Sequence, residues 1–108
     1  MAQRWAAIDI GTNSVRLLIC EKENGRIKGE KKVCITRLGE GLSKEKHLTQ
    51  EAMQRTEQAV LQFAKEAVSQ GAEGPVWCYA TSAARQADNG LAFLQRLTDS
   101  GLVRAELL

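Results

Sequence analysis

The chain has 108 residues, a formal net charge of +2, 26% charged residues and 44% hydrophobic residues. This composition is typical of one globular domain, excludes a disordered chain, and gives no argument for nucleic-acid binding. No apolar run approaches the roughly 18 residues of a membrane span, and the amino terminus lacks the apolar core of a signal peptide, so we expect a cytoplasmic protein with no membrane contact.

The first predicted element is a strand that ends in a polar turn. Residues 5–21 contain two apolar runs separated by four residues: Gly11, Thr12, Asn13 and Ser14. Gly11 permits a positive φ and close backbone approach, and successive amides in such a turn can form an anion-binding nest. Asp9, at the end of the first strand, could hold Mg²⁺ against a phosphate. The pattern indicates phosphate chemistry, although the same residue types also dominate ordinary hairpin turns.

The next two strands, Ser14 to Glu23 and Arg26 to Thr36, form a predicted hairpin. Asn24-Gly25 between them is a strong turn signal, because both positions accept a positive φ. A two-residue loop sets Glu23 opposite Arg26 and Glu21 opposite Lys28, so opposite charges support the register. The third strand carries a basic cluster that is either a polyanion-binding surface or, more commonly, a solvated strand end: Arg26, Lys28, Lys31 and Lys32.

A helix follows a glycine-punctuated loop over residues 37–42 and a charged loop over residues 43–47. Thr49 is the predicted N-cap, and Met53 falls where it can pack back against Leu48. Apolar residues then recur at helical spacing until Gly71, the predicted C-terminal stop.

The last third of the chain alternates strands and helices. Pro75 to Ala80 is almost continuously apolar, which predicts a parallel strand buried on both faces. A loop over residues 81–85 leads to a helix with Asn89 as its cap and Gly101 as its stop, and Leu102 to Leu108 is a final strand. Cys20, Cys34 and Cys78 each fall in an apolar strand, which predicts core or near-core thiols rather than a metal site.

Three blocks in order carry a family resemblance: Ala7-Ile8-Asp9-Ile10-Gly11-Thr12-Asn13-Ser14 with Arg16-Leu17-Leu18-Ile19, then Arg37-Leu38-Gly39-Glu40-Gly41-Leu42, and then Ala80-Thr81-Ser82-Ala83-Ala84-Arg85-Gln86-Ala87-Asp88-Asn89. Together they resemble the amino terminus of the exopolyphosphatase and guanosine pentaphosphate phosphohydrolase family, in the actin-like ATPase superfamily. The resemblance implies an α/β fold: a ribonuclease H-like lobe with a mixed sheet and the order βββαβαβ.

The resemblance also implies Mg²⁺-assisted hydrolysis of a phosphoanhydride, with inorganic polyphosphate or the 5′ γ-phosphate of guanosine pentaphosphate as substrate. In this reading Gly11, Thr12, Asn13 and Ser14 bind the phosphoryl group, Asp9 orients the metal, and Arg85, on the loop after the fourth strand, matches the family's catalytic arginine. Without the surrounding motif Arg85 would be an ordinary surface residue.

Family members continue beyond this length, into a segment with the glutamate that activates water, a second phosphate loop and another lobe. We therefore expect residues 1–108 to be the amino-terminal part of one domain, inactive alone, from an enzyme that is a homodimer. Apolar surface left uncovered could drive self-association through strands or helices. Two alternatives remain: the first lobe of an actin-like sugar kinase or ATPase, and a non-catalytic polyphosphate-binding module.

Overall fold

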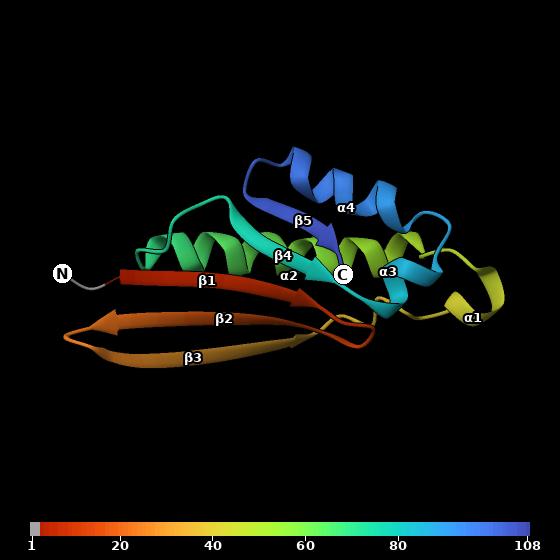
Figure 1. The fold of residues 1–108 in the computed structure, drawn as a ribbon. Helices are drawn as coiled ribbons and strands as arrows, with labels where there is room; N and C mark the ends of the chain where they lie inside the picture. The colour runs from red at the N-terminus through yellow and green to blue at the C-terminus, as the bar shows by residue number, and fades with distance from the viewer. Residues whose placement is uncertain (1–2) are drawn as a thin grey trace.

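A five-stranded mixed sheet is the framework of the structure, a computed structural model that describes residues 3–108 (Figure 1). Its strands are β1 (Gln3–Ile10), β2 (Ser14–Glu23), β3 (Arg26–Ile35), β4 (Val76–Ala80) and β5 (Val103–Leu107). Their order across the sheet is β3-β2-β1-β4-β5. The first three strands are antiparallel, whereas β4 and β5 run parallel to β1. The predicted ribonuclease H-like order and mixed sheet are confirmed.

Two long helices, α2 (Gln50–Ser69) and α4 (Gly90–Asp99), pack against one face of the sheet. Alternate residues of every central strand are buried beneath them, as expected for strands whose side chains point to opposite faces. These core residues include Ile8, Ile10, Val15, Leu17, Val76, Cys78, Ala80 and Val103.

Helix α2 begins and ends where its sequence signals predict. Thr49 Oγ1 accepts a hydrogen bond from the Ala52 amide at 3.1 Å, which satisfies a backbone donor in the first turn. At the other end Gly71 has φ 101°, and the Ala72 amide reaches back to the Ala67 carbonyl at 3.1 Å. This left-handed cap satisfies carbonyls of the last turn and turns the chain toward β4.

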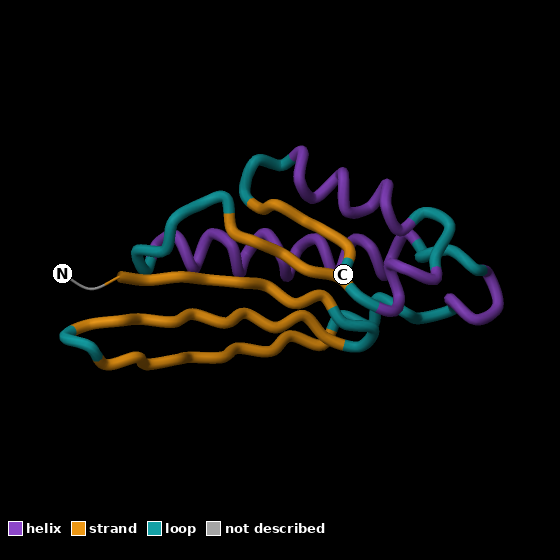
Figure 2. The backbone as a smooth tube through the Cα atoms, in the orientation of Figure 1, coloured by secondary structure: helices purple, strands orange, loops and turns teal. Residues whose placement is uncertain are grey.

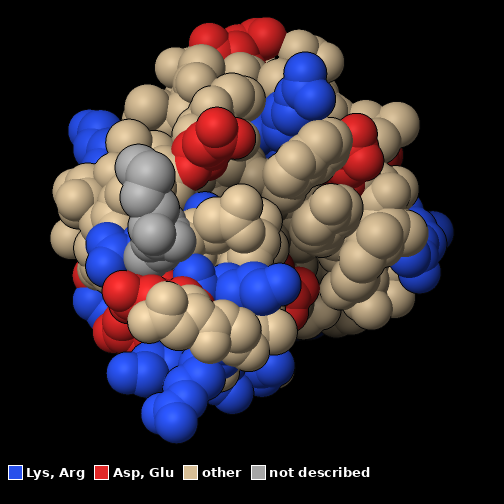
Figure 3. Space-filling model, turned by 60° about the vertical axis from the view of Figure 1, so that its left-hand side comes forward, with Lys and Arg blue, Asp and Glu red and all other residues tan. Residues whose placement is uncertain are grey.

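The β2–β3 hairpin has the predicted turn and register. Asn24 and Gly25 have φ 52° and 79°, and the strands pair Glu23 with Arg26 and Glu21 with Lys28. In Figure 3, blue side chains crowd the hairpin end of the molecule, beside acidic ones. Lys32 forms an ion pair with Glu66 of α2. The basic cluster therefore extends along a strand that also carries one acid, Glu30, and part of the charge of the cluster is already paired.

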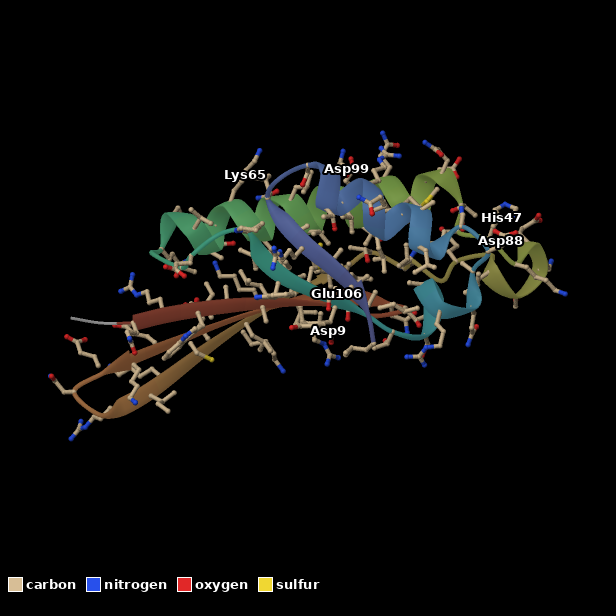
Figure 4. All side chains as sticks on the ribbon, turned by 45° about the horizontal axis from the view of Figure 1, so that its top comes forward. Asp9, His47, Lys65, Asp88, Asp99 and Glu106 are labelled. Carbon is tan, nitrogen blue, oxygen red and sulfur yellow. The ribbon has the colours of Figure 1, made fainter. Side chains whose placement is uncertain are left out.

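Three local expectations are wrong. A short helix, α1 (Leu42–Glu45), begins at the last residue of the second block, and another, α3 (Ser82–Gln86), follows β4, so neither stretch is a plain loop. Asn89 occupies the N-cap position of α4, but its side chain makes no cap bond. Instead its amide group pairs with both the N–H and the C=O of Leu48, at 2.7 and 3.0 Å. This bond joins the start of α4 to the start of α2, where His47 and Asp88 also lie (Figure 4).

The second face of the sheet is uncovered within residues 3–108. We call it the open face, and its exposed apolar side chains are Trp5, Leu18, Ile27, Val33, Ile35 and Trp77. Trp77 stacks on Tyr79 with ring centroids 6.1 Å apart, and the Arg104 guanidinium lies 5.1 Å from the Trp77 ring centroid. The expectation that β4 is buried on both faces is thus wrong for this chain, because helices cover only one side of it.

In the part of the chain that the structure describes, no helix combines the length and apolar character needed to cross a membrane.

Burial of Cys78 predicts a pH-dependent loss of stability. Burial, helped by the charge of Asp9, raises the pKa of the Cys78 thiol from 9.0 to about 12. The unfolded chain therefore loses this proton at lower pH than the folded chain does, and stability present below pH 9 declines as pH rises toward 12. The expected slope is about 1.4 kcal/mol per pH unit.

The measurement is the free energy of unfolding, by denaturant titration, at a series of pH values from 8 to 11. Cys78→Ala removes the thiol and is expected to flatten the curve above pH 9, although a cavity lowers its stability at every pH. Parallel curves for the two proteins would show that Cys78 does not contribute to the pH dependence.

Candidate functional site

Residues 11–14 form an exposed turn between β1 and β2, here called the 11–14 turn. The Gly11 amide donates to the Ser14 carbonyl at 2.9 Å and closes the turn. Thr12 and Asn13 are exposed, and within residues 3–108 their amides donate to no carbonyl of the protein. Unpaired backbone N–H groups at the surface are available to water or to an anion.

The loop after β3 holds this turn in place through backbone hydrogen bonds. The amides of Thr36 and Arg37 both donate to the Asn13 carbonyl, at 3.1 and 3.0 Å, and the Gly39 amide donates to the Thr12 carbonyl at 2.9 Å. Figure 2 shows the two segments, in teal, together at one end of the sheet. Because a trans peptide points its C=O and N–H in opposite directions, a Thr12 carbonyl held toward Gly39 turns the Asn13 amide outward.

Two glycines allow close packing here. A Cβ at Gly11 would lie 3.1 Å from the Ser14 carbonyl oxygen, and one at Gly39 would lie 2.4 Å from Thr12 Cγ2. The sequence allowed both a close backbone approach and a positive φ at Gly11. The structure has the close approach to Ser14, whereas Gly11 is not among the positive-φ residues that the structure describes. Gly11 continues the strand into its closing hydrogen bond with Ser14 rather than reversing the chain.

Asp9 lies beside the turn, on the open face. The strand pairings place it in one row across the sheet with Val33, Arg16, Tyr79 and Glu106. Asp9 is partly buried, and it forms no ion pair within residues 3–108. Glu106 is two strands away, about 10 Å at the usual strand spacing, and Figure 4 labels both carboxylates.

Arg16 is a candidate residue that the sequence placed in the first block but to which it gave no role in the site. It is exposed, and it is the register partner of Asp9 on the neighbouring antiparallel strand. Directly paired residues in an antiparallel sheet have Cβ atoms about 5 Å apart. The alternation of exposed and buried residues in β2 contained the signal, because it assigns Arg16 and Asp9 to the same face.

Arg85 lies in α3, not in a loop. Its guanidinium donates to the Leu108 carbonyl, and the Leu108 amide donates to the Ala80 carbonyl at 2.9 Å. Ala80 ends β4 and pairs with Ile10 of β1. Arg85 therefore lies at the same end of the sheet as the 11–14 turn, on the β4–β5 side. Within residues 3–108, no hydrogen bond or ion pair joins it to Asp9 or to the turn.

The arrangement has the chemistry of an anion site with an acid at its margin. Free amides of the turn can donate hydrogen bonds to phosphoryl oxygens, Arg16 and Arg85 supply positive charge at the same end of the sheet, and Asp9 can hold a cation between itself and the anion. Within residues 3–108, this site included, no group of three or more His, Cys, Asp or Glu side chains could hold a metal, so Asp9 would share a cation with the bound anion and water.

Comparison with known proteins identifies the family. The profile of the Ppx/GppA phosphatase family matches residues 18–108, most of the chain. The chain belongs to this family. The matched segment begins within β2, just after the 11–14 turn, and includes both later blocks.

Curated relatives extend the match to the turn itself. Exopolyphosphatase 2 of Mycobacterium tuberculosis is 39% identical over 101 residues, which cover 89% of this chain and 31% of that protein. The bifunctional 3-dehydroquinate synthase/phosphatase of Fusobacterium nucleatum subsp. nucleatum is 37% identical over 106 residues, which cover 92% of this chain and 16% of that protein.

Solved structures of Ppx/GppA proteins have the same fold. The Aquifex aeolicus family member superposes with a TM-score of 0.91 and 29% identity, covering 100% of this chain and 35% of that one. An exopolyphosphatase from Cytophaga hutchinsonii gives a TM-score of 0.89 and 27% identity, covering 98% of this chain and 34% of that one. The chain thus spans about a third of these solved relatives.

Proposed function

We propose that this chain is the phosphate-binding part of an exopolyphosphatase-type hydrolase. Its substrate is the terminal phosphate of inorganic polyphosphate or the 5′ γ-phosphate of guanosine pentaphosphate. The observation that supports this most directly is the 11–14 turn, whose exposed amides have no partner within residues 3–108 and lie beside the unpaired carboxylate of Asp9. Amides already fixed in place stabilise phosphoryl charge without reorganising during the reaction.

Each side chain near the turn has a proposed role. Amides of the turn, with the Thr12 and Ser14 hydroxyls, receive the phosphoryl oxygens. Arg85 and Arg16 approach the phosphate chain from opposite sides of Asp9 and neutralise its charge, because a guanidinium can grip two oxygens at once. Arg85 would exchange its present bond to the Leu108 carbonyl for the substrate.

The oxygen ligand that this site offers is of the kind that Mg²⁺ binds. A magnesium ion is usually held by one or two carboxylates together with substrate phosphates and water, and Asp9 offers one carboxylate without a competing ion pair. When bound, the ion would lower the negative charge that an attacking water meets.

A general base must lie within hydrogen-bond reach of the water that it activates. None of the acids in this chain is assigned that role: Asp9 is given to the metal, and Glu106 is about 10 Å from it across the sheet. The isolated chain should therefore bind phosphate chains weakly and release no phosphate.

The test measures phosphate release from polyphosphate and from guanosine pentaphosphate by the complete enzyme containing this chain, with and without Mg²⁺. We expect release that depends on Mg²⁺, and no release by residues 1–108 alone. Transfer of phosphate from a nucleotide to a sugar would favour the kinase alternative. Binding without release by the complete protein would favour the binding module.

A further inference from the structure

Arg55 of α2 contacts three successive parts of the loop that holds the 11–14 turn. Its Nε donates to the Thr36 carbonyl at 2.9 Å, and its Nη2 lies 3.4 Å from the Arg37 carbonyl and 2.7 Å from Glu40 Oε2. The planar guanidinium can donate in several directions at once, which a lysine cannot do with the same rigidity. Arg55 thus fixes this loop from the helix side.

A single peptide group connects Arg55 to the turn. The carbonyl of Thr36 accepts from Arg55, and the N–H of the same peptide group, on Arg37, donates to the Asn13 carbonyl at 3.0 Å. Because the peptide is planar, any displacement of the Thr36 carbonyl also displaces the amide that holds Asn13. Hydrogen bonds in such a chain also polarise and strengthen one another.

The loop needs such support. Arg37 has φ 51°, a left-handed conformation that a residue with a side chain keeps only when its surroundings hold it there. Arg55 contacts the carbonyls on both sides of that position, since it reaches both Thr36 and Arg37. Its ion pair with Glu40 anchors the far end of the same segment.

We propose that Arg55 is a positioning residue for the phosphate site. It touches neither substrate nor metal. By holding residues 36–40, it keeps the Thr12 and Asn13 carbonyls turned inward, which aims the Asn13 amide at the phosphoryl group. This inference rests on the proposed function of the 11–14 turn.

The first experiment needs no ligand. Amide hydrogen exchange is measured on Arg37 and Gly39, whose N–H groups hold the turn, in the wild-type chain and in Arg55→Gln. We expect exchange at both amides to accelerate by about tenfold or more, while the middle of α2 is unaffected. Arg96→Gln is the matched control, because Arg96 also pairs with an acid of α2, Glu57 at 2.6 Å, and no hydrogen bond or ion pair within residues 3–108 joins it to the loop.

The second experiment titrates each protein with inorganic tripolyphosphate and follows the Thr12 and Asn13 amide resonances. Arg55→Gln is expected to weaken binding about tenfold, on the order of what a small misplacement of binding groups costs. Arg96→Gln should bind tripolyphosphate as tightly as the wild type does, even if its melting temperature falls as much as that of Arg55→Gln. Arg55→Lys keeps the positive charge but not the planar guanidinium with its several donors, and should recover only part of the affinity for tripolyphosphate.

The outcomes separate the two proposals. If the amide resonances of the wild-type chain do not respond to tripolyphosphate, the proposed function of the turn is wrong. The exchange rates of Arg37 and Gly39 would still test whether Arg55 fixes the loop. Unchanged exchange at Arg37 and Gly39 in Arg55→Gln would overturn the role of Arg55, as would full recovery by lysine. If Arg55→Gln does not fold, Arg55→Lys carries the same comparison.

Discussion

Asp9→Asn is expected to lower phosphate release by the complete enzyme at least about tenfold, which corresponds to roughly 1.4 kcal/mol of added barrier. Asparagine preserves the shape of the side chain and removes its charge, so a cation beside the phosphate loses its carboxylate ligand. The measurement is the turnover rate on polyphosphate over a range of Mg²⁺ concentrations. The variant should also need more Mg²⁺ to reach half of its own maximal rate.

Asp99→Asn is the matched control for this substitution. Asp99 is exposed at the end of α4, where it accepts a hydrogen bond from Gln95 at 2.8 Å, and it is remote from the turn (Figure 4).

Arg85→Ala should reduce turnover to a similar extent as Asp9→Asn, because it removes positive charge from the same end of the sheet. Wild-type rates in both Asp9→Asn and Arg85→Ala would exclude these residues from the mechanism.

Gly90→Ala is expected to destabilise the fold by about 3 kcal/mol or more, near the upper end of what overpacking a core costs. A Cβ at Gly90 would lie 1.8 Å from the Ala84 carbonyl oxygen and 2.8 Å from its carbon. Those atoms belong to the backbone of α3, so the clash cannot be relieved by a side-chain rotation. For a domain of this size the melting temperature should fall by roughly 12 °C or more.

Gly29→Ala provides the comparison for Gly90→Ala. Gly29 lies on the exposed edge strand β3, its Cβ would meet nothing within 4 Å, and its φ is not positive. We expect the free energy of unfolding of Gly29→Ala to stay within about 0.5 kcal/mol of the wild-type value. Thermal unfolding followed by circular dichroism measures both variants. Equal melting temperatures for the two would mean that α3 and α4 can separate without loss.

Local signals predicted most of the fold because each was complete within a few residues. Asn24-Gly25 and the flanking charges defined the hairpin register, and Thr49 together with Gly71 defined both ends of α2. Helix α3 was missed because five residues are too few to show a helical period. Asn89 was assigned a local cap, but a partner far away in sequence, Leu48, uses its side chain instead.

The candidate site was only partly predictable for the same reason. The motif around the 11–14 turn is contiguous, so Asp9 and the turn residues could be selected from sequence. Arg55 is one polar residue among many on an amphipathic helix, and its role depends on contacts with residues 15 to 19 positions earlier in the chain. Gly39 likewise faces Thr12 across a contact between two separate loops.

Tryptophan fluorescence can report whether the open face of the sheet is covered. The chain has two tryptophans, Trp5 and Trp77, and both lie on that side with 49% and 39% of their surface exposed. Their emission should therefore respond less to loss of the helix-covered core than to anything that shields the indoles from water. A blue shift on adding the remainder of the enzyme would show that this side has become an internal surface.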